Sequence, residues 1–546
     1  MTVRKMLAIA CLVSCFAAAV CVGLLGSSSA PDEKYGGTLV WGVSDDPLGG
    51  LCPILTNGGT DLFAYGFSAQ PLSWGGENYP AELRPILATS WEVSPDGLVW
   101  TIHLRSGVNW QDGKPFTADD VLFWAQTIQD PATGAEWFRE RFYVDGLPFT
   151  FEKIDAYTVR VTTAAPVDNL MSSICVPLIP AHYFIENNIS NSEIATSPAN
   201  VSGGLGTGPF RIAEYRPSEA IILERFDGYW RGRPYLDRVV LRIIPDPDAM
   251  LSALLSGEVD WTMIAVNQIP QVKKSAACDV IAIPVDAAYS IALNSTKPML
   301  ADKRTRHALM EALDRRAIWE NVSMGYGQIL YGPWIPVCTA YEDLPDYPYD
   351  VAAAKALLAE VGWLPGPGGI LVAGNVAGVV PGTRFRLEYW VTRVGDAFPT
   401  LVQAYWRDIG VEVEQKFTES SVFFDENMGK ADKPFDVYTV RNGFFGPSAG
   451  NYSDLIGSDA AASMYSYANS QVAALFDQAS HAASPAEADV YYKQAGRIIW
   501  DDLPILPLFQ RTALWAYNTR VQYADAVVSA SLLGVFENPE LLWVKK

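Results

Sequence analysis

Residues suited to binding a small molecule gather in the segment 441–452, which reads RNGFFGPSAGNY. Arg441 offers a guanidinium that can hold a carboxylate through two parallel hydrogen bonds, or form an ordinary surface ion pair. Asn442 offers a neutral amide, and Phe444 and Phe445 offer rings on which a ligand can stack. The segment contains no aspartate or glutamate. This composition predicts contact with a ligand rather than a turn alone.

Four further residues are candidates for the same chemistry, and each has a structural alternative. Trp261 follows a short predicted strand, where its ring can stack on a ligand or be buried in the core. Trp390 ends another predicted strand, and Tyr289 is a further aromatic candidate with core packing as its alternative. Asn294 can hydrogen-bond a ligand or form a turn.

Patterns typical of hydrolytic or metal chemistry are missing from the sequence. No G-x-S-x-G motif is present, and Glu412 and Glu414 alternate on an ordinary predicted strand. The four histidines are isolated in the sequence, so we predict no metal site and no cofactor. The net charge of −21 disfavours nucleic acid as a partner. A secreted hydrolase of glycan or peptide is the competing hypothesis, but an enzyme is not expected.

Residues 1–30 are predicted to be a signal peptide or an N-terminal anchor. Two basic residues precede an apolar run from Met6 to Leu25. Cleavage near Ser28, lipid attachment at Cys15 and retention as an uncleaved anchor are three open alternatives. In each case the remaining chain is expected in the periplasm or at the cell surface.

The remaining cysteines are Cys52, Cys175, Cys278 and Cys338. Exported proteins often contain disulfides, so we expect one or two bridges, with four buried free thiols as the alternative. Four cysteines allow three pairings, and the sequence does not choose among them.

The order of the predicted elements is typical of an α/β protein. The region 384–414 reads as strand, helix and strand, which predicts two parallel strands joined by a right-handed crossover. Residues 436–440 form a third candidate strand. Because ligands bind outside the carboxyl ends of strands in open α/β sheets, Trp390 and the segment that starts at Arg441 are expected at the same edge.

Local signals predict several other elements. The Pro-Asp-Gly turn at 95–97 predicts a hairpin. Thr117 and the acid three residues later predict a capping box. A helix capped by Asp302 is predicted to continue through Ala317. The Gly- and Pro-rich segment between Gly362 and Thr383 is predicted to be a hairpin or a loop insertion.

Seven motifs together resemble the extracellular solute-binding proteins of ABC transporters, in the oligopeptide, dipeptide and nickel-binding family. They occur in the order of that family between residues 36 and 521. The motifs are LATSWEVSPDG at 87–97, LRSGVNWQDGKPFTADDV at 104–121, GTGPF at 206–210, DGYW at 227–230, LSGEVD at 255–260, LNSTKP at 293–298 and LPILPL at 503–508.

This resemblance implies a periplasmic-binding-protein-like fold of two lobes joined by a hinge, with an additional domain inserted in the first lobe. It implies a hinge near 284–289 and 509–515, ligand capture by closure, delivery to a membrane ABC permease, and a monomer. The implied boundaries are first lobe 36–72, 201–287 and 510–546, inserted domain 73–200, and second lobe 288–509.

The resemblance leaves the ligand open between an oligosaccharide and an oligopeptide. Peptide-binding members have an acidic residue in a Gly-Trp-x-x-Asp-like context, which receives the amino terminus of the peptide. The corresponding positions here, 444–448, contain no acid, and a buried ammonium without a counter-charge is costly. The 17 tryptophans and the paired phenylalanines suit sugar stacking, so we modestly favour a sugar. Metal or haem-like cofactor capture is a further alternative from the same family.

Overall fold

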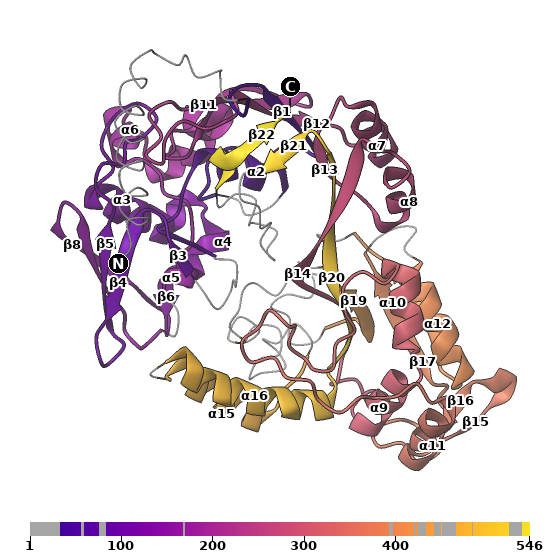
Figure 1. Ribbon diagram of the computed structural model, residues 1–546. Helices are drawn as coiled ribbons and strands as arrows, with labels where there is room; N and C mark the ends of the chain where they lie inside the picture. Colours follow the sequence, from indigo (N-terminus) through magenta and orange to yellow (C-terminus); the bar gives the residue numbers. More distant parts are fainter. Residues whose placement is uncertain are drawn as a thin grey trace, which may run out of the picture.

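The computed structural model shows a mixed α/β molecule with two lobes (Figure 1). The structure describes residues 33–47, 49–55, 59–75, 83–167, 170–392, 397–419, 422–423, 433–441, 449, 466–482, 484–523 and 538–545.

One ten-stranded sheet runs through both lobes. We call the side with β1, β12 and β13 the first lobe, and the side with β17, β18 and β19 the second lobe. The strands, in spatial order, are β10 (Phe210–Arg216), β11 (Ala220–Arg225), β12 (Arg238–Ile243), β1 (Thr38–Val43), β13 (Trp261–Met263), β20 (Ile505–Asn518), β14 (Cys278–Leu293), β19 (Val437–Val440), β17 (Arg386–Val391) and β18 (Glu412–Phe417).

Strands β14 and β20 connect the lobes (Figure 1). They are 16 and 14 residues long and pair antiparallel with each other. The pairing shifts register between Pro284 and Ala288, opposite Gln510 and Thr512. We call this irregular point the crossing. It falls in the segments where the sequence predicts the hinge, although the hinge motion itself stays a prediction.

A four-stranded sheet follows the first strands of the first lobe. It consists of β4 (Ala88–Val93), β5 (Val99–Leu104), β9 (Thr158–Thr162) and β8 (Thr150–Asp155). The antiparallel pairing of β4 with β5 confirms the predicted hairpin. Helix α3 (Ala118–Gln129) has the predicted capping box, because Asp120 accepts from the Thr117 amide at 2.9 Å. Both elements form from contacts within a few residues, so their sequence signals are sufficient.

One hydrophobic cluster contains residues of both this four-stranded sheet and the large sheet. Buried Trp124 of α3 and buried Trp41 of β1 belong to the same cluster. The region predicted as an inserted domain therefore shares a core with the first lobe. Its boundaries at 73 and 200, like those of the other lobe segments, stay predictions.

The second lobe confirms the predicted strand, helix and strand. Strands β17 and β18 are parallel and are joined through α12 (Phe398–Asp408). Strand β19 is parallel to β17, and β15 (Trp363–Pro365) with β16 (Leu371–Ala373) forms the predicted hairpin.

One predicted helix of the second lobe is two helices. Helix α9 (Lys303–Glu311) has the predicted cap Asp302, but it ends before Leu313. Helix α10 (Arg315–Ser323) then starts with its own cap, because the Asp314 side chain accepts from the Ala317 amide at 2.9 Å. The predicted continuation through Ala317 is therefore wrong. An aspartate that caps a new helix competes with the hydrophobic spacing that favours one continuous helix.

The other described helices and strands complete these layers. They are α2 (Gly59–Ser68), α4 (Glu136–Arg139), α5 (Leu170–Ser173), α6 (Ala181–Glu186), α7 (Pro247–Ser256), α8 (Ile269–Val272), α11 (Val351–Val361), α15 (Ser470–Ser480), α16 (Pro485–Asp502), β2 (Ser73–Gly75), β3 (Leu83–Pro85), β6 (Tyr143–Val144), β7 (Leu147–Pro148), β21 (Val521–Tyr523) and β22 (Leu542–Val544).

The expectation of one or two disulfides is wrong for the four cysteines that the structure describes. Cys52, Cys175, Cys278 and Cys338 are all free thiols. Cys278 and Cys338 lie in two separate hydrophobic clusters, and neither is the cluster that Cys52 and Cys175 contact. Cys175 instead donates its thiol hydrogen to the Ser73 carbonyl oxygen at 3.1 Å. Burial raises the pKa of Cys52, Cys175 and Cys338 to about 12.

We expect Cys52, Cys175 and Cys338 to resist iodoacetamide at pH 8 in the native protein. The thiolate is the reactive form, and a pKa of about 12 leaves roughly one thiol in ten thousand ionised. In guanidinium chloride without reductant, all three and Cys278 should be alkylated. Peptide mass mapping measures both states, and a disulfide-linked peptide in the unreduced denatured sample would contradict the structure.

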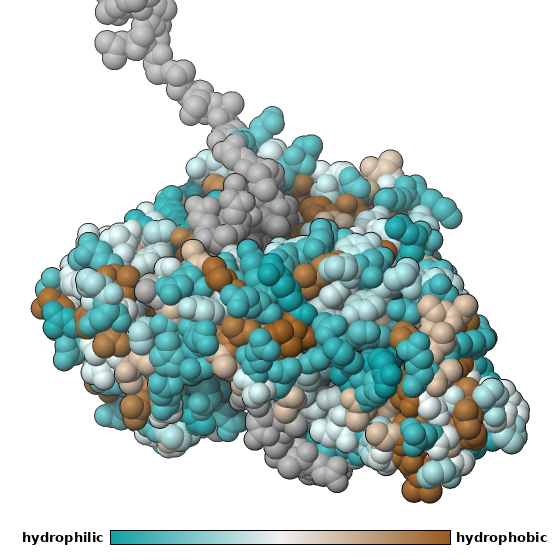
Figure 2. Space-filling model, turned by 90° about the horizontal axis from the view of Figure 1, so that it is seen from below, coloured by the Kyte–Doolittle hydropathy of each residue, from teal (hydrophilic) through white to brown (hydrophobic). Residues whose placement is uncertain are grey.

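The described helices and one face of the surface bear on membrane contact. No described helix combines the length and the apolar character that crossing a bilayer requires. Apolar side chains on the face shown in Figure 2 are interspersed with hydrophilic ones. The predicted signal peptide or anchor, residues 1–30, lies outside the described residues.

Candidate functional site

The carboxyl end of β19 lies at the crossing of the two long strands. Val440, its last residue, pairs with Ser290 of β14, directly after the register shift. Arg441 follows immediately and is half-buried. Asn442, Phe444 and Phe445 lie outside the described residues. Of the four predicted binding residues in the segment 441–452, Arg441 is therefore the one whose contacts the structure describes.

Arg441 contacts an aromatic group on the long strands. Its guanidinium carbon lies 5.3 Å from the ring centroid of Tyr289, a cation–π distance. The Tyr289 ring stacks on Phe509 of β20 at 4.8 Å between centroids and meets Phe398 of α12 edge-on at 5.7 Å. Tyr289 and Arg441, two of the predicted residues, thus lie side by side at the crossing.

Arg511 is a second cation at this place. Its Nη1 donates to the backbone carbonyl oxygen of Arg441 at 2.5 Å, which ties β20 to the end of β19. We call Tyr289, Arg441, Phe509 and Arg511 the crossing cluster. Two guanidiniums next to stacked rings suit a ligand that has both a carboxylate and an apolar part.

Arg511 is not among the residues predicted from the sequence, although the sequence contains a signal for it. Arg511 is the single charged residue in the 14-residue strand ILPLFQRTALWAYN. A lone charge in a largely apolar strand is a candidate for a specific role, because moving a charge out of water is costly. Which residue it contacts depends on a pairing between positions 70 apart in the chain.

Trp261 lies inside an aromatic layer of the first lobe. Its ring centroid is 5.3 Å from that of Trp41 and 5.3 Å from that of Tyr517, and the residue is 4% exposed. Strand pairing places Trp41, Trp261 and Tyr517 in one row across the sheet. This geometry favours the core alternative for Trp261, and its ligand role stays a prediction.

Trp390 is also covered by neighbours and is 4% exposed. The Lys416 ammonium lies 4.3 Å from its ring centroid, and Phe423 lies 5.9 Å away. Register places Trp390 opposite Tyr438 on the face of the sheet away from Tyr389. Trp390 lies near the carboxyl end of β17, as predicted, but it is not part of the crossing cluster.

Asn294 is fully buried and hydrogen-bonded within the chain. Its side-chain amide donates to the carbonyl oxygens of Lys433 at 3.3 Å and Phe435 at 2.9 Å. Its Oδ1 accepts from the Thr296 hydroxyl at 2.6 Å and the Thr296 amide at 3.2 Å. This geometry favours the turn alternative, because both ends of the amide are already used.

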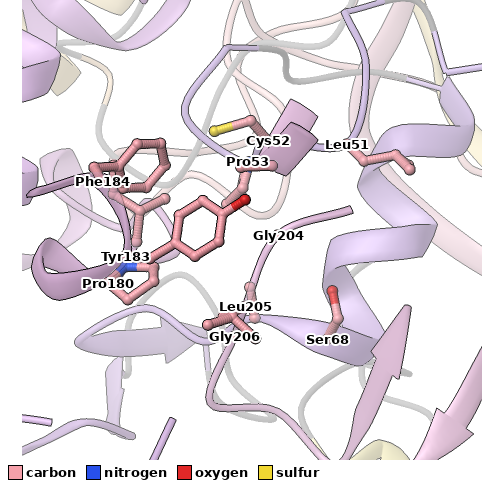
Figure 3. A pocket seen from close by; sticks show the side chains of 13 residues that line it. Leu51, Cys52, Pro53, Ser68, Pro180, Tyr183, Phe184, Gly204, Leu205 and Gly206 are labelled. Carbon is pink, nitrogen blue, oxygen red and sulfur yellow. The ribbon is translucent and has the colours of Figure 1, made fainter. Parts of the chain in front are cut away.

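A small pocket lies elsewhere in the first lobe, and it is too narrow for a solute. Leu51, Cys52, Tyr183 and Phe184 line it, together with the backbone near Gly206 (Figure 3). It has room for about one water molecule. Among the described residues, no group of three or more His, Cys, Asp or Glu side chains is arranged to hold a metal ion.

The family is decided by a match that covers most of the chain. The model for bacterial extracellular solute-binding proteins, family 5 Middle, matches residues 82–464. The chain belongs to this family. A family 5 solute-binding protein has the two-lobe periplasmic-binding-protein fold, which confirms the predicted fold class.

Two curated proteins illustrate the relationship of this solute-binding protein to its family. Heme-binding protein A of Haemophilus influenzae is 29% identical over 516 residues, which cover 89% of each chain. The dipeptide-binding protein of Escherichia coli K12 is 28% identical over 359 residues, which cover 61% of this chain and 63% of the relative.

Solved structures agree with the fold of this solute-binding protein. The ABC transporter substrate-binding protein CtaP of Listeria monocytogenes has a TM-score of 0.82 at 27% identity, over 94% of this chain and 100% of that one. The oligopeptide-binding protein AppA of Bacillus subtilis, solved with a nonapeptide, has a TM-score of 0.72 at 23% identity, over 94% and 99%.

Membership of the family also bears on function and location. Family 5 consists of extracellular solute-binding proteins of transport systems rather than of enzymes. The relatives and structures named above refer to heme, dipeptides and oligopeptides, and none refers to an oligosaccharide. The modest preference for a sugar therefore finds no support in the family.

Proposed function

We propose that this protein captures a peptide that has a free carboxylate and delivers it to the membrane permease of an ABC importer. The observation that carries this proposal is the crossing cluster, in which Arg441 and Arg511 meet beside Tyr289 and Phe509. A guanidinium holds a carboxylate through two hydrogen bonds, and the rings offer a surface for an apolar side chain. Relatives named for dipeptides and oligopeptides support this ligand class.

The position of the cluster suits ligand-driven closure. Arg441 follows a strand of the second lobe, whereas Arg511 and Tyr289 lie on the strands that both lobes share. A ligand bound here lies next to the axis of any rotation between the lobes. If the ligand contacts both lobes only in a closed arrangement, it binds that arrangement more tightly than the open one. The difference between the two affinities sets how far the ligand shifts the protein toward the closed arrangement. The permease then distinguishes the loaded protein by its shape, and the protein acts as a monomer.

A thermal-shift screen tests the ligand class. The mature protein is heated with di- to pentapeptides, with the same peptides as C-terminal amides, with di- to tetrasaccharides and with hemin. Binding to the folded state alone raises the melting temperature. We expect peptides with a free carboxylate to give a larger increase than their amides. Stabilisation by saccharides alone, or by hemin alone, would reject the peptide proposal.

Arg441→Ala should weaken binding of the best peptide by about tenfold to a hundredfold. Removing a charged hydrogen-bond donor from a carboxylate costs about 1.5–3 kcal/mol. Arg441→Lys should recover only part of the affinity, because an ammonium cannot make the bidentate contact.

The control is Arg386→Ala. Arg386 is an exposed arginine at the start of β17, whereas Arg441 follows the carboxyl end of the parallel strand β19. Isothermal titration calorimetry measures all three variants. Equal affinity of Arg441→Ala and Arg386→Ala would remove Arg441 from the site.

A further inference from the structure

The segment 324–330 runs alongside the crossing and pairs with β20 at one isolated β-bridge. We call this segment the hinge strap. Ile329 makes an antiparallel bridge with Phe509 of β20. The Leu330 amide donates to the Leu508 carbonyl oxygen at 3.1 Å, and the Gln510 amide donates to the Gln328 carbonyl oxygen at 2.8 Å. The other edge of β20 at this point pairs with β14. The two long strands are therefore flanked by a third hydrogen-bonded segment where their register is irregular.

The hinge strap is fixed to the second lobe at both of its ends. The Trp319 indole nitrogen of α10 donates to the Tyr326 carbonyl oxygen at 3.0 Å. Arg315, a buried arginine of the same helix, donates to the Leu330 carbonyl oxygen at 2.6 Å. Because α10 packs into the core of the second lobe through the fully buried Ile318, the strap moves with that lobe.

The side chain of Tyr326 reaches the first lobe. It packs against a hydrophobic cluster that includes Ile269 and Leu514, beyond the crossing along β20. Its hydroxyl also accepts a hydrogen bond from the ammonium of Lys273, the residue after α8, at 3.3 Å. Tyr326 is thus a second-lobe residue in contact with first-lobe side chains, at a place separate from the crossing cluster.

A glycine permits the close approach of the strap to β20. Gly327 has φ +85°, a conformation that residues with a side chain adopt rarely. A Cβ atom at this position would lie 2.1 Å from the Gln510 carbonyl oxygen. Any larger residue would therefore strain the turn and push the strap away from the long strand.

We propose that the hinge strap is a latch, in which Tyr326 holds the two lobes of the ligand-free protein in the orientation seen here. This inference rests on the proposed hinge closure. Rotation about the crossing leaves the bonds of the strap to α10 unchanged, because both belong to the second lobe. The same rotation moves Ile269, Leu514 and Lys273 relative to Tyr326. Closure must therefore break or remake the Tyr326 contacts, and their strength sets the resting population of closed protein.

Distance measurement between the lobes tests the latch without any ligand. Spin labels are attached through Ser252→Cys on α7 and Lys355→Cys on α11, both at exposed positions. The buried native cysteines Cys52, Cys175 and Cys338, whose pKa values are raised to about 12, are poor competitors for the label. Cys278→Ser removes the remaining described thiol. Double electron–electron resonance then reports the distribution of distances between the lobes.

Tyr326→Ala should increase about tenfold the minor fraction of molecules whose distance between the two labels differs from the resting one. Gly327→Ala should change this fraction in the same direction. Tyr349→Ala is the matched control, because Tyr349 is a half-exposed tyrosine of the second lobe that meets Tyr405. We expect its distribution to equal that of the parent. Circular dichroism verifies that each variant is folded.

Superimposable distributions for the parent and folded Tyr326→Ala would overturn the latch. If Tyr326→Ala does not fold, Gly327→Ala decides the question by the same criterion. Because no ligand is added, the result does not depend on which solute the protein carries. A failed peptide screen with a positive distance result would reject the ligand class and leave the latch standing.

Discussion

Gln111→Leu is expected to lower the free energy of unfolding by about 4 kcal/mol. The Gln111 side chain is buried, and its amide nitrogen donates to the carbonyl oxygens of Ser68, Gly208 and Phe210 at 3.1, 3.1 and 2.8 Å. Its Oε1 accepts from the Gly206 amide at 3.0 Å. Leucine has a similar volume but cannot make these bonds. The Ser68 carbonyl oxygen keeps the Gly208 amide as a donor at 3.0 Å. The other backbone groups lose the Gln111 bond, at about 1–3 kcal/mol for each group that water cannot reach.

The same residue explains why two motifs of the sequence occur together. Gln111 comes from NWQDG, and its partners Gly206, Gly208 and Phe210 come from GTGPF. A Cβ atom on Gly206 would lie 1.8 Å from the Ser68 carbonyl oxygen, so this backbone packs too tightly for a side chain. The Gln111 amide therefore joins the four-stranded-sheet region to a tightly packed stretch of first-lobe backbone.

Urea denaturation followed by circular dichroism measures the effect of Gln111→Leu. Gln415→Leu is the control, because Gln415 is exposed and bonds only to Thr400 and Gln403 among the hydrogen bonds seen for its side chain. Its effect should stay within about 0.5 kcal/mol. A Gln111→Leu variant as stable as this control would show that the four Gln111 side-chain hydrogen bonds contribute little to stability.

Arg520→Ala is expected to cost about 3 kcal/mol of stability. Arg520 holds Asp260 through two hydrogen bonds, at 2.6 Å from Nε and 2.8 Å from Nη2. The Asp260 side chain is 0% exposed, whereas that of Arg520 is 42% exposed. Removing the arginine leaves a buried carboxylate with the Val40 amide, at 3.0 Å, as its remaining observed donor. Loss of one partner of a buried pair costs about 3–5 kcal/mol, and water entering beside the truncated residue favours the lower end.

A double-mutant cycle with Asp260→Ala separates the pair from the loss of packing. The double variant should be less destabilised than the sum of the two single variants, because no charge is then left buried. Arg242→Ala, which breaks an exposed pair with Glu258, serves as the control and should cost no more than about 1 kcal/mol. Equal urea midpoints for Arg520→Ala and Arg242→Ala would contradict the assigned role of Asp260.

The crossing cluster shows how far sequence reasoning extends toward the site. The strand, helix and strand at 384–414 and the strand before Arg441 depend on local hydrophobic pattern, which places Arg441 at a strand end without any tertiary information. That Arg441 meets Tyr289 and Arg511 depends on the register of β14 and β20. Register is set by packing on both faces of a sheet, so no short window of sequence contains it.

Local sequence signals are sufficient for the elements whose stabilising bonds close within a few residues. The Thr117 capping box and the hairpin around the turn at 95–97 are of this kind. The seven ordered motifs determined the family for the same reason, since each is a local pattern.

Features that depend on residues far apart in the chain could not be predicted from local signals and became visible in the folded protein. The free thiols, the approach of Tyr326 to the first lobe and the contact of Arg511 with Arg441 are of this kind. Each depends on which segments pack together over tens to hundreds of residues. Such contacts form only when a common core brings the segments together, so their geometry belongs to the fold as a whole.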